Sequence, residues 1–202
     1  MADAARPLVP DADDDQVVVI EGATWADYQR MLEIRGEKAI PRLTYLEGRL
    51  QLLRPSRAHE SVKSMIGCLI EAWCVEVGVE ITPYGSWTLE RKEVERGVEP
   101  DECYVVGEHD DPELPGLAIE VVRTSGGVSK LEVYRKLGVR EVWFWRRDTI
   151  ELFALRGDRY EPIATSEVLP GIDHALLSRF VPEKPMTRAV RAYVRAIRDS
   201  RT

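Results

Sequence analysis

Long apolar runs are missing from this chain of 202 residues, and so is a signal sequence. No segment approaches the roughly 18 consecutive apolar residues that a membrane-spanning helix requires. Residues 1–15 have neither the basic start nor the apolar centre of a signal peptide. We therefore expect a cytoplasmic protein that makes no contact with membranes.

Cysteine is also scarce, with three residues in the chain. Cys68, Cys74 and Cys103 have no metal-ligand spacing, which argues against the common zinc motifs. We expect buried thiols rather than a disulfide or a zinc site. There is no internal repeat and no glycine-rich phosphate loop, because Gly126 and Gly127 lack the spacing of that motif and fit a turn instead.

An excess of positive charge is the third feature that is missing. The net charge is -7, whereas proteins that bind nucleic acid through its phosphates usually have a basic surface. Residues 1–15 carry a net charge of -4 and residues 183–202 carry +4, so the middle of the chain still holds -7. The carboxylates of an acidic metal site would account for part of that negative charge.

The chain has enough apolar material for one buried core, since 44% of its residues are hydrophobic. Residues 1–15 are rich in Ala, Asp and Pro without periodicity, which predicts a disordered acidic leader. Residues 16–182 form the predicted domain, and residues 183–202 a basic C-terminal helix. We expect this helix to dock with its arginines in solvent; a nucleic-acid or partner contact is the alternative.

The apolar pattern predicts a mixed α/β fold. Helices are predicted over residues 25–35, 58–77, 129–137 and 186–201. Capping patterns support the first helix, with Thr24 and Asp27, and the third, with Ser129 and Glu132. Strands are predicted over residues 17–20, 43–53 as a hairpin, 79–84, 87–91, 98–106, 117–122, 141–145, 149–155 and 159–164.

Two carboxylates are expected at one end of this sheet. Asp101 lies near the start of the strand predicted over residues 98–106, and Glu120 near the end of the next. If these strands pair as antiparallel neighbours, Asp101 falls opposite about Glu120. Glu120 lies between Ile119 and Val121, and a charge is rarely buried in an apolar strand unless it is paired or binds a metal.

This pair suits a hard divalent cation. Two neighbouring carboxylates raise each other's pKa unless a proton or a cation neutralises them. Mg²⁺ is bound by one or two carboxylates, with waters and substrate phosphate completing its shell. Lys130, in the first turn of the third predicted helix, adds a cation near the same sheet end and could orient water or stabilise developing charge.

Each of these residues also has a purely structural interpretation. Asp101 could be a turn residue after Pro100, Lys130 could be solvated, and Glu120 could pair with Arg123. Their combination on one sheet edge favours a site. The aromatic strand over residues 141–145 could stack on bases, but core packing or an oligomer contact fits it better. As an exposed aromatic strand, it would support a homodimer.

Several motifs together resemble a known family. The chain is similar to the Uma-type family of restriction-endonuclease-like proteins in the PD-(D/E)XK nuclease superfamily, over roughly residues 25 to 182. The most specific part of the resemblance is its Lys-Tyr-Gly-Val-Glu-Trp series. The matching segments are residues 45–48, His59, residues 100–101, residues 120–122, residues 129–135 and residues 138–143.

The resemblance implies a restriction-endonuclease-like fold with a central mixed sheet flanked by helices. It implies a Mg²⁺ or Mn²⁺ ion held by Asp101 and Glu120, with the Val121 carbonyl nearby and Glu47 as a further acidic ligand. It also implies a catalytic Lys130 displaced from the strand onto the helix, since Val122 stands where the superfamily motif has Lys.

Two further residues have accessory roles in this interpretation. Tyr134 is one turn beyond Lys130 and can share its face. His59 lies at the start of the long predicted helix. It could act as a base or a phosphate ligand, or it could only cap the helix or pack in the core. The link between Glu120 and Lys130 is shorter than the family's usual one.

The resulting hypothesis is a metal-dependent endonuclease that hydrolyses phosphodiester bonds of DNA. Two alternatives stay open. One is a catalytically inactive nuclease fold that serves as a binding or oligomerisation module, which the acidic composition favours. The other is an acid–base hydrolase that uses the two carboxylates without metal and acts on a glycoside or another neutral substrate.

Overall fold

The computed structural model describes residues 14–109, 112–123 and 127–201 and contains two β-sheets and five α-helices within these ranges. The larger sheet has six strands in the order β11-β10-β9-β8-β7-β4. In it, β8 and β9 are parallel and the other neighbours are antiparallel, so the sheet is mixed. Its strands are β4 (Ile81–Pro83), β7 (Glu102–Val106), β8 (Leu117–Val121), β9 (Glu141–Arg146), β10 (Thr149–Arg156) and β11 (Arg159–Ile163).

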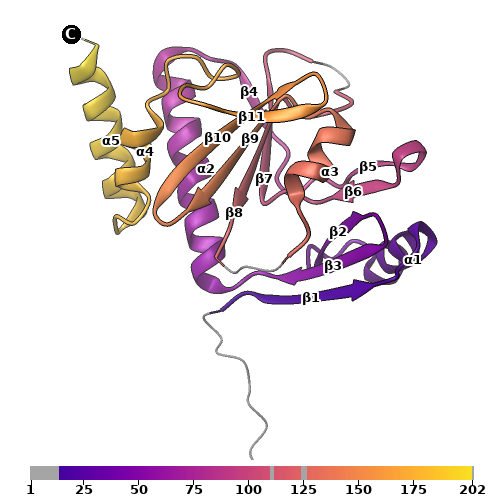
Figure 1. Cartoon of the computed structure of the whole chain (residues 1–202). Helices are drawn as coiled ribbons and strands as arrows, with labels where there is room; N and C mark the ends of the chain where they lie inside the picture. Colours follow the sequence, from indigo (N-terminus) through magenta and orange to yellow (C-terminus); the bar gives the residue numbers. More distant parts are fainter. Residues whose placement is uncertain (1–13, 110–111, 124–126, 202) are drawn as a thin grey trace, which may run out of the picture.

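Helices cover both faces of this sheet, which confirms the predicted fold class (Figure 1). One face packs on α2 (Arg57–Val77), α4 (His174–Phe180) and α5 (Met186–Ser200), and the other on α3 (Lys130–Leu137). Side chains alternate along β8, so Leu117, Ile119 and Val121 face α2 while Ala118 faces α3. Glu120 is two residues beyond Ala118 and therefore lies on the α3 face.

The second sheet is antiparallel and was not predicted as a separate unit. Its order is β1-β3-β2-β6-β5, and α1 (Trp25–Arg35) packs on it. Its strands are β1 (Gln16–Glu21), β2 (Arg42–Leu46), β3 (Arg49–Arg54), β5 (Leu89–Arg91) and β6 (Arg96–Val98), with a short 3-10 helix, Lys92–Val94, between the last two. Figure 1 shows this sheet below and beside α3.

The prediction of a single strand over residues 98–106 is wrong. Two strands, β6 and β7, are present instead, and they belong to different sheets. Pro100 between them has no N–H to donate to a ladder. Glu99 is tied to the smaller sheet, because the N–H of Leu43 donates to Glu99 Oε2 at 2.7 Å. This break places Asp101 at the junction of the two sheets.

Helix ends agree well with the predicted signals. Thr24 and Asp27 form the predicted capping box of α1, and Gly78 ends α2 with a φ of 77°, a conformation that favours glycine. The prediction of a capping box for α3 is wrong, since Ser129 is the N-cap residue but its side chain makes no capping hydrogen bond. Helix α4, which is capped by Asp173, was not predicted.

The aromatic strand β9 is buried. Trp143, Phe144 and Trp145 are 0%, 2% and 5% exposed, because β8 and β10 flank the strand and helices cover both faces. The expectation of an exposed aromatic strand is therefore wrong, and it no longer supports a homodimer. Core packing, the favoured alternative, is confirmed.

Helix α5 docks as predicted. Ala189, Tyr193 and Ile197 are buried in the core shared with α2, while Arg191 and Arg195 are exposed. Cys74 and Cys103 are buried free thiols, and Cys68 is only partly buried. Among the helices of the described ranges, none is long and apolar enough to cross a membrane.

Candidate functional site at the junction of the two sheets

Asp101 and Glu120 lie next to each other, as the sequence predicted. β7 and β8 pair with Glu102 opposite Ile119, and one further step in this register places Asp101 opposite Glu120. The N–H of Val121 donates to Asp101 Oδ2 at 2.6 Å. Both side chains are buried, at 0% and 1% exposure.

Asp101 is held by positive groups from the surrounding elements. Arg42, the first residue of β2, donates to Asp101 Oδ1 and also forms an ion pair with Glu60 at 2.7 Å. His59 on α2 approaches the same oxygen, with Nε2 at 3.0 Å. The carboxylate is therefore fixed between the smaller sheet, α2 and the backbone of β8.

His59 connects Asp101 to the start of the described chain. Its Nδ1 lies 2.8 Å from Asp15 Oδ2, and Asp15 also accepts a hydrogen bond from the N–H of Ser56. Asp15 had been assigned to the disordered leader, and this boundary is wrong: its side chain is 2% exposed. Residues 1–13 of that leader lie outside the described residues.

Two side chains of α3 hold Glu120 in place. Lys130 donates to Glu120 Oε2, and the Tyr134 hydroxyl, one turn later, donates to Oε1 at 2.5 Å. The link from β8 to α3 therefore allows Lys130 to reach Glu120. Tyr134 shares the face of Lys130, as the helical spacing predicted.

The pKa values of the two carboxylates are shifted in opposite directions. Burial raises the pKa of Glu120; Lys130 and Tyr134 lower it only in part, and the nearby charge of Asp101 adds to the increase. Burial alone would also raise the pKa of Asp101, but His59, Lys130 and Arg42 outweigh it and hold the pKa well below its usual range.

The same neighbours shift His59. Burial alone would lower the pKa of His59, but the carboxylates of Asp101 and Asp15 outweigh it and raise the pKa to about 9. His59 is 0% exposed and therefore acts as a buried charge partner of Asp101. Neither its burial nor its contacts fit a base or a phosphate ligand that touches substrate.

Glu47 does not join this group. It occupies the turn between β2 and β3, with a φ of 46°, and its side chain is 72% exposed. Arg42, which contacts Asp101, is at the opposite end of β2, so the separation is on the order of 15 Å along the strand. Glu47 pairs with Arg96 at 2.5 Å instead. The structure thus contradicts its proposed role beside Asp101.

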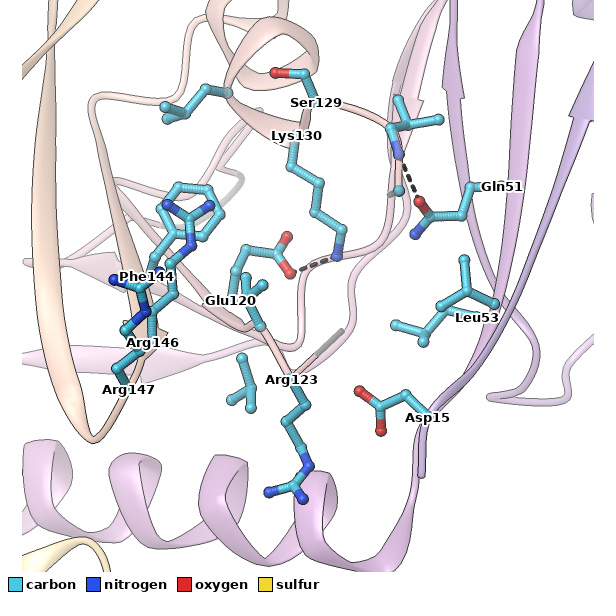
Figure 2. Close-up of a pocket in the computed structure, with 16 residues that line it drawn as sticks. Asp15, Gln51, Leu53, Glu120, Arg123, Ser129, Lys130, Phe144, Arg146 and Arg147 are labelled. Carbon is cyan, nitrogen blue, oxygen red and sulfur yellow. Dashed lines mark hydrogen bonds and ion pairs between the residues drawn. The ribbon is translucent and has the colours of Figure 1, made fainter. Parts of the chain in front are cut away.

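A pocket of ≈ 610 Å³ opens beside Glu120, Val121 and Lys130. Figure 2 shows the Glu120–Lys130 pair with Arg146 and Arg147 on one side and Gln51 and Leu53 on the other. Asp101 is not among its lining residues. The remaining lining residues are Asp15, Val17, Val122, Arg123, Gly127, Val128, Ser129, Leu131 and Phe144.

The link from β8 to α3 is anchored to the smaller sheet across this pocket. Gln51 on β3 accepts a hydrogen bond from the N–H of Val128 at 2.7 Å. A Cβ on Gly127 would lie 2.4 Å from Gln51 Oε1, so a larger residue there would displace the end of the Gln51 side chain from its present position. The contact holds the start of α3, and with it Lys130, next to the pocket.

The donor set fits a hydrated Mg²⁺ or Mn²⁺ ion. A carboxylate has about four lone-pair sites, and the contacts above use three on Asp101 and two on Glu120. Oxygens of both side chains therefore keep acceptor capacity, and the Val121 carbonyl belongs to a pocket-lining residue. No group of three His, Cys, Asp or Glu side chains in the described ranges forms a ready-made metal cluster. Mg²⁺ does not require one.

Several residues of the site were not found from the sequence. Arg42 and Asp15 are far from their partners along the chain, and nothing near them indicates the contact. Gln51 did carry a signal, because it is a polar residue between Leu50 and Leu52 in an apolar strand. The same pattern had identified Glu120.

Comparisons with known proteins give a similar solved structure and a matching family. One solved structure similar to this chain is described as "a putative nuclease belonging to DUF820" from Anabaena variabilis ATCC 29413; it is 12% identical, with a TM-score of 0.46, and the alignment covers 85% of this chain and 99% of that one. No protein with a curated description matches the sequence. The family model named Uma2, described as "Putative restriction endonuclease", matches residues 25–184, and the chain belongs to this family.

Proposed function

We propose that this protein is a metal-dependent DNA endonuclease that hydrolyses phosphodiester bonds with Mg²⁺ or Mn²⁺ as cofactor. The observation that carries the proposal is the pocket wall where Glu120 and Lys130 meet, with Asp101 directly behind them on the same sheet face. Membership of a restriction-endonuclease family supports the class of reaction. DNA as the substrate follows from that class.

Asp101, Glu120 and the Val121 carbonyl would hold the cation, which supplies Lewis-acid stabilisation of phosphoryl oxygens when bound. Lys130 would place its ammonium against the negative charge that develops on the phosphate, or would orient the attacking water. Tyr134 fixes the second oxygen of Glu120. Arg42 and His59 keep Asp101 ionised and in place.

The acid–base alternative has less support. A metal-free hydrolase of that type needs both carboxylates against the substrate. Glu120 lines the pocket, whereas Asp101 is 0% exposed and is surrounded by Arg42, His59 and the backbone of Val121. An inactive binding module remains the second candidate, since the Lys130–Glu120 ion pair satisfies both charges without a cation.

Calorimetric titration with Mn²⁺ tests the proposal. The wild-type protein should bind Mn²⁺ and nick supercoiled plasmid in its presence but not in EDTA. Glu120→Gln removes a ligand charge at nearly constant shape and should abolish both. Glu47→Gln is the matched control, because Glu47 is an exposed carboxylate away from the pocket, and it should retain both.

Two results would contradict the proposal in different ways. If the wild-type protein shows no affinity for Mn²⁺, even with duplex DNA present, the metal-dependent mechanism is contradicted. The inactive binding module would then be the remaining candidate. Mn²⁺ binding that is lost in Glu47→Gln but kept in Glu120→Gln would place the ion at a different site.

A further inference from the structure

The pocket beside Glu120 is positively charged, in contrast to the chain as a whole. Four cationic side chains line it, Arg123, Lys130, Arg146 and Arg147, against two carboxylates in a protein of net charge -7. Both carboxylates are already paired, Glu120 with Lys130 and Asp15 with His59. The three arginines are thus in excess over the acidic groups of the pocket.

These arginines are available to a ligand. Neither Arg123 nor Arg147 has a hydrogen bond or ion pair with another residue in the described parts of the chain, and both are exposed. Arg146 has a half-exposed ion pair with Glu151 at 3.1 Å, and its guanidinium lies 4.3 Å from the centre of the Phe144 ring. That stacking orients the guanidinium without neutralising it.

The turn that carries Arg147 has an unusual sequence for its geometry. β9 and β10 are joined by Arg147 and Asp148, both with positive φ (49° and 60°), between the paired residues Arg146 and Thr149. Such two-residue turns of the I′ type favour Asn or Gly at both positions. An arginine occupies this position although glycine would fit the backbone better, which points to a role for its side chain.

We propose that Arg123, Arg146 and Arg147 bind successive phosphates of a nucleic-acid strand and so place the scissile phosphate at Glu120 and Lys130. The three residues come from the end of β9, the β9–β10 turn and the link after β8, and all of them line the same pocket as Glu120. A guanidinium binds phosphate oxygens in bidentate fashion. An extended polyanion engages several separate guanidiniums, whereas one free phosphate cannot. Only the placement of the scissile phosphate rests on the proposed function; the binding of the strand by the three arginines does not.

Binding in EDTA tests the three arginines separately from catalysis. The probe is a fluorescein-labelled 24-base-pair DNA duplex, followed by anisotropy at several KCl concentrations. Arg147→Gln should weaken binding about three- to tenfold and reduce the slope of log K against log salt by about 1. The triple substitution of Arg123, Arg146 and Arg147 by Gln should reduce that slope by about 3.

Two further variants exclude trivial explanations. Arg147→Gly removes the guanidinium while relieving the positive φ, so it should fold at least as stably as wild type in thermal denaturation and still lose the same affinity. Arg191→Gln removes an exposed arginine from α5 and should leave binding unchanged. Equal loss in Arg191→Gln would assign binding to the basic helix and overturn the proposal.

Other outcomes separate this inference from the proposed function. If wild type cleaves DNA but the triple variant binds the duplex as wild type does, the inference fails and the nuclease stands. If wild type never cleaves but the arginine variants lose affinity as predicted, the phosphate-binding arginines stand as part of a binding module. Displacement of the duplex by a few millimolar inorganic phosphate would contradict binding of an extended strand and would indicate a simple anion site.

Discussion

Two buried glutamates on neighbouring strands of the larger sheet have different surroundings. β8 and β9 run parallel, with Glu120 paired to Phe144 at one end and Glu141 paired to Leu117 at the other. Glu120 is 1% exposed and Glu141 is 0% exposed. Glu141 lies on the face towards α2, with Trp143, whereas Glu120 faces α3.

The difference lies in what surrounds each carboxylate. Glu141 accepts hydrogen bonds from the Trp143 indole at 2.5 Å and from the N–H groups of Glu167 and Val168 at 2.9 and 3.2 Å, all neutral donors. Glu120 has a cation, a second carboxylate behind it and a pocket beside it. Burial of a carboxylate therefore does not identify a site by itself; charged partners and an open pocket do.

The largest expected effect comes from exchanging each glutamate for glutamine. Glu120→Gln should reduce plasmid cleavage by at least about 10³-fold and change stability by less than about 1 kcal/mol, because it also removes repulsion with Asp101. Glu141→Gln should leave cleavage by the folded protein unchanged and lower the free energy of unfolding by about 2 to 3 kcal/mol. An NH2 group would replace one of the two carboxylate oxygens, and it cannot accept from the N–H donors that face that oxygen. Urea denaturation and cleavage assays on both variants measure this.

The reversed pattern would break the comparison. Should Glu141→Gln lose cleavage while staying folded, or Glu120→Gln lose stability with full activity, the assignment of site and scaffold would have to be exchanged.

Lys130 tests whether the cation beside Glu120 takes part in the reaction. Lys130→Ala should retain Mn²⁺ binding and lower the rate of cleavage on the order of 10²- to 10³-fold, the usual loss for one charge-stabilising group. Lys136→Ala, an exposed lysine on the same helix, is the control and should change neither. Unchanged cleavage by Lys130→Ala would leave Lys130 as a structural partner of Glu120.

Local signals predicted most of the fold. The capping residues Thr24 and Asp27 and the apolar pattern placed α1 and α2 correctly, because these signals involve residues close along the chain. The break between β6 and β7 has a local signal in Pro100, but the separate sheets that the two strands join depend on contacts such as that of Glu99 with Leu43 in another strand. α4 has seven residues, too few for a clear apolar period.

Part of the site could also be predicted from local signals. Asp101 opposite Glu120 follows from antiparallel register, and Tyr134 beside Lys130 follows from helical spacing, so the sequence placed these four together. Glu47 was carried over from a family resemblance without a geometric reason, and the turn between β2 and β3 holds it elsewhere. Arg42 and Asp15 reach the site through tertiary packing between the sheets, which has no local signal.

The smallest expected effect concerns the charge on the far side of Asp101. Asp15→Asn removes the ionic partner of His59 and should lower the free energy of unfolding by about 1 to 2 kcal/mol in chemical denaturation. Asp14→Asn, an exposed neighbour, should change it by less than about 0.5 kcal/mol. If Asp15→Asn keeps its cleavage rate, Asp15 belongs with Glu141 as a buried scaffold carboxylate. A loss of cleavage without a loss of stability would instead place Asp15 with Glu120, because it also lines the pocket.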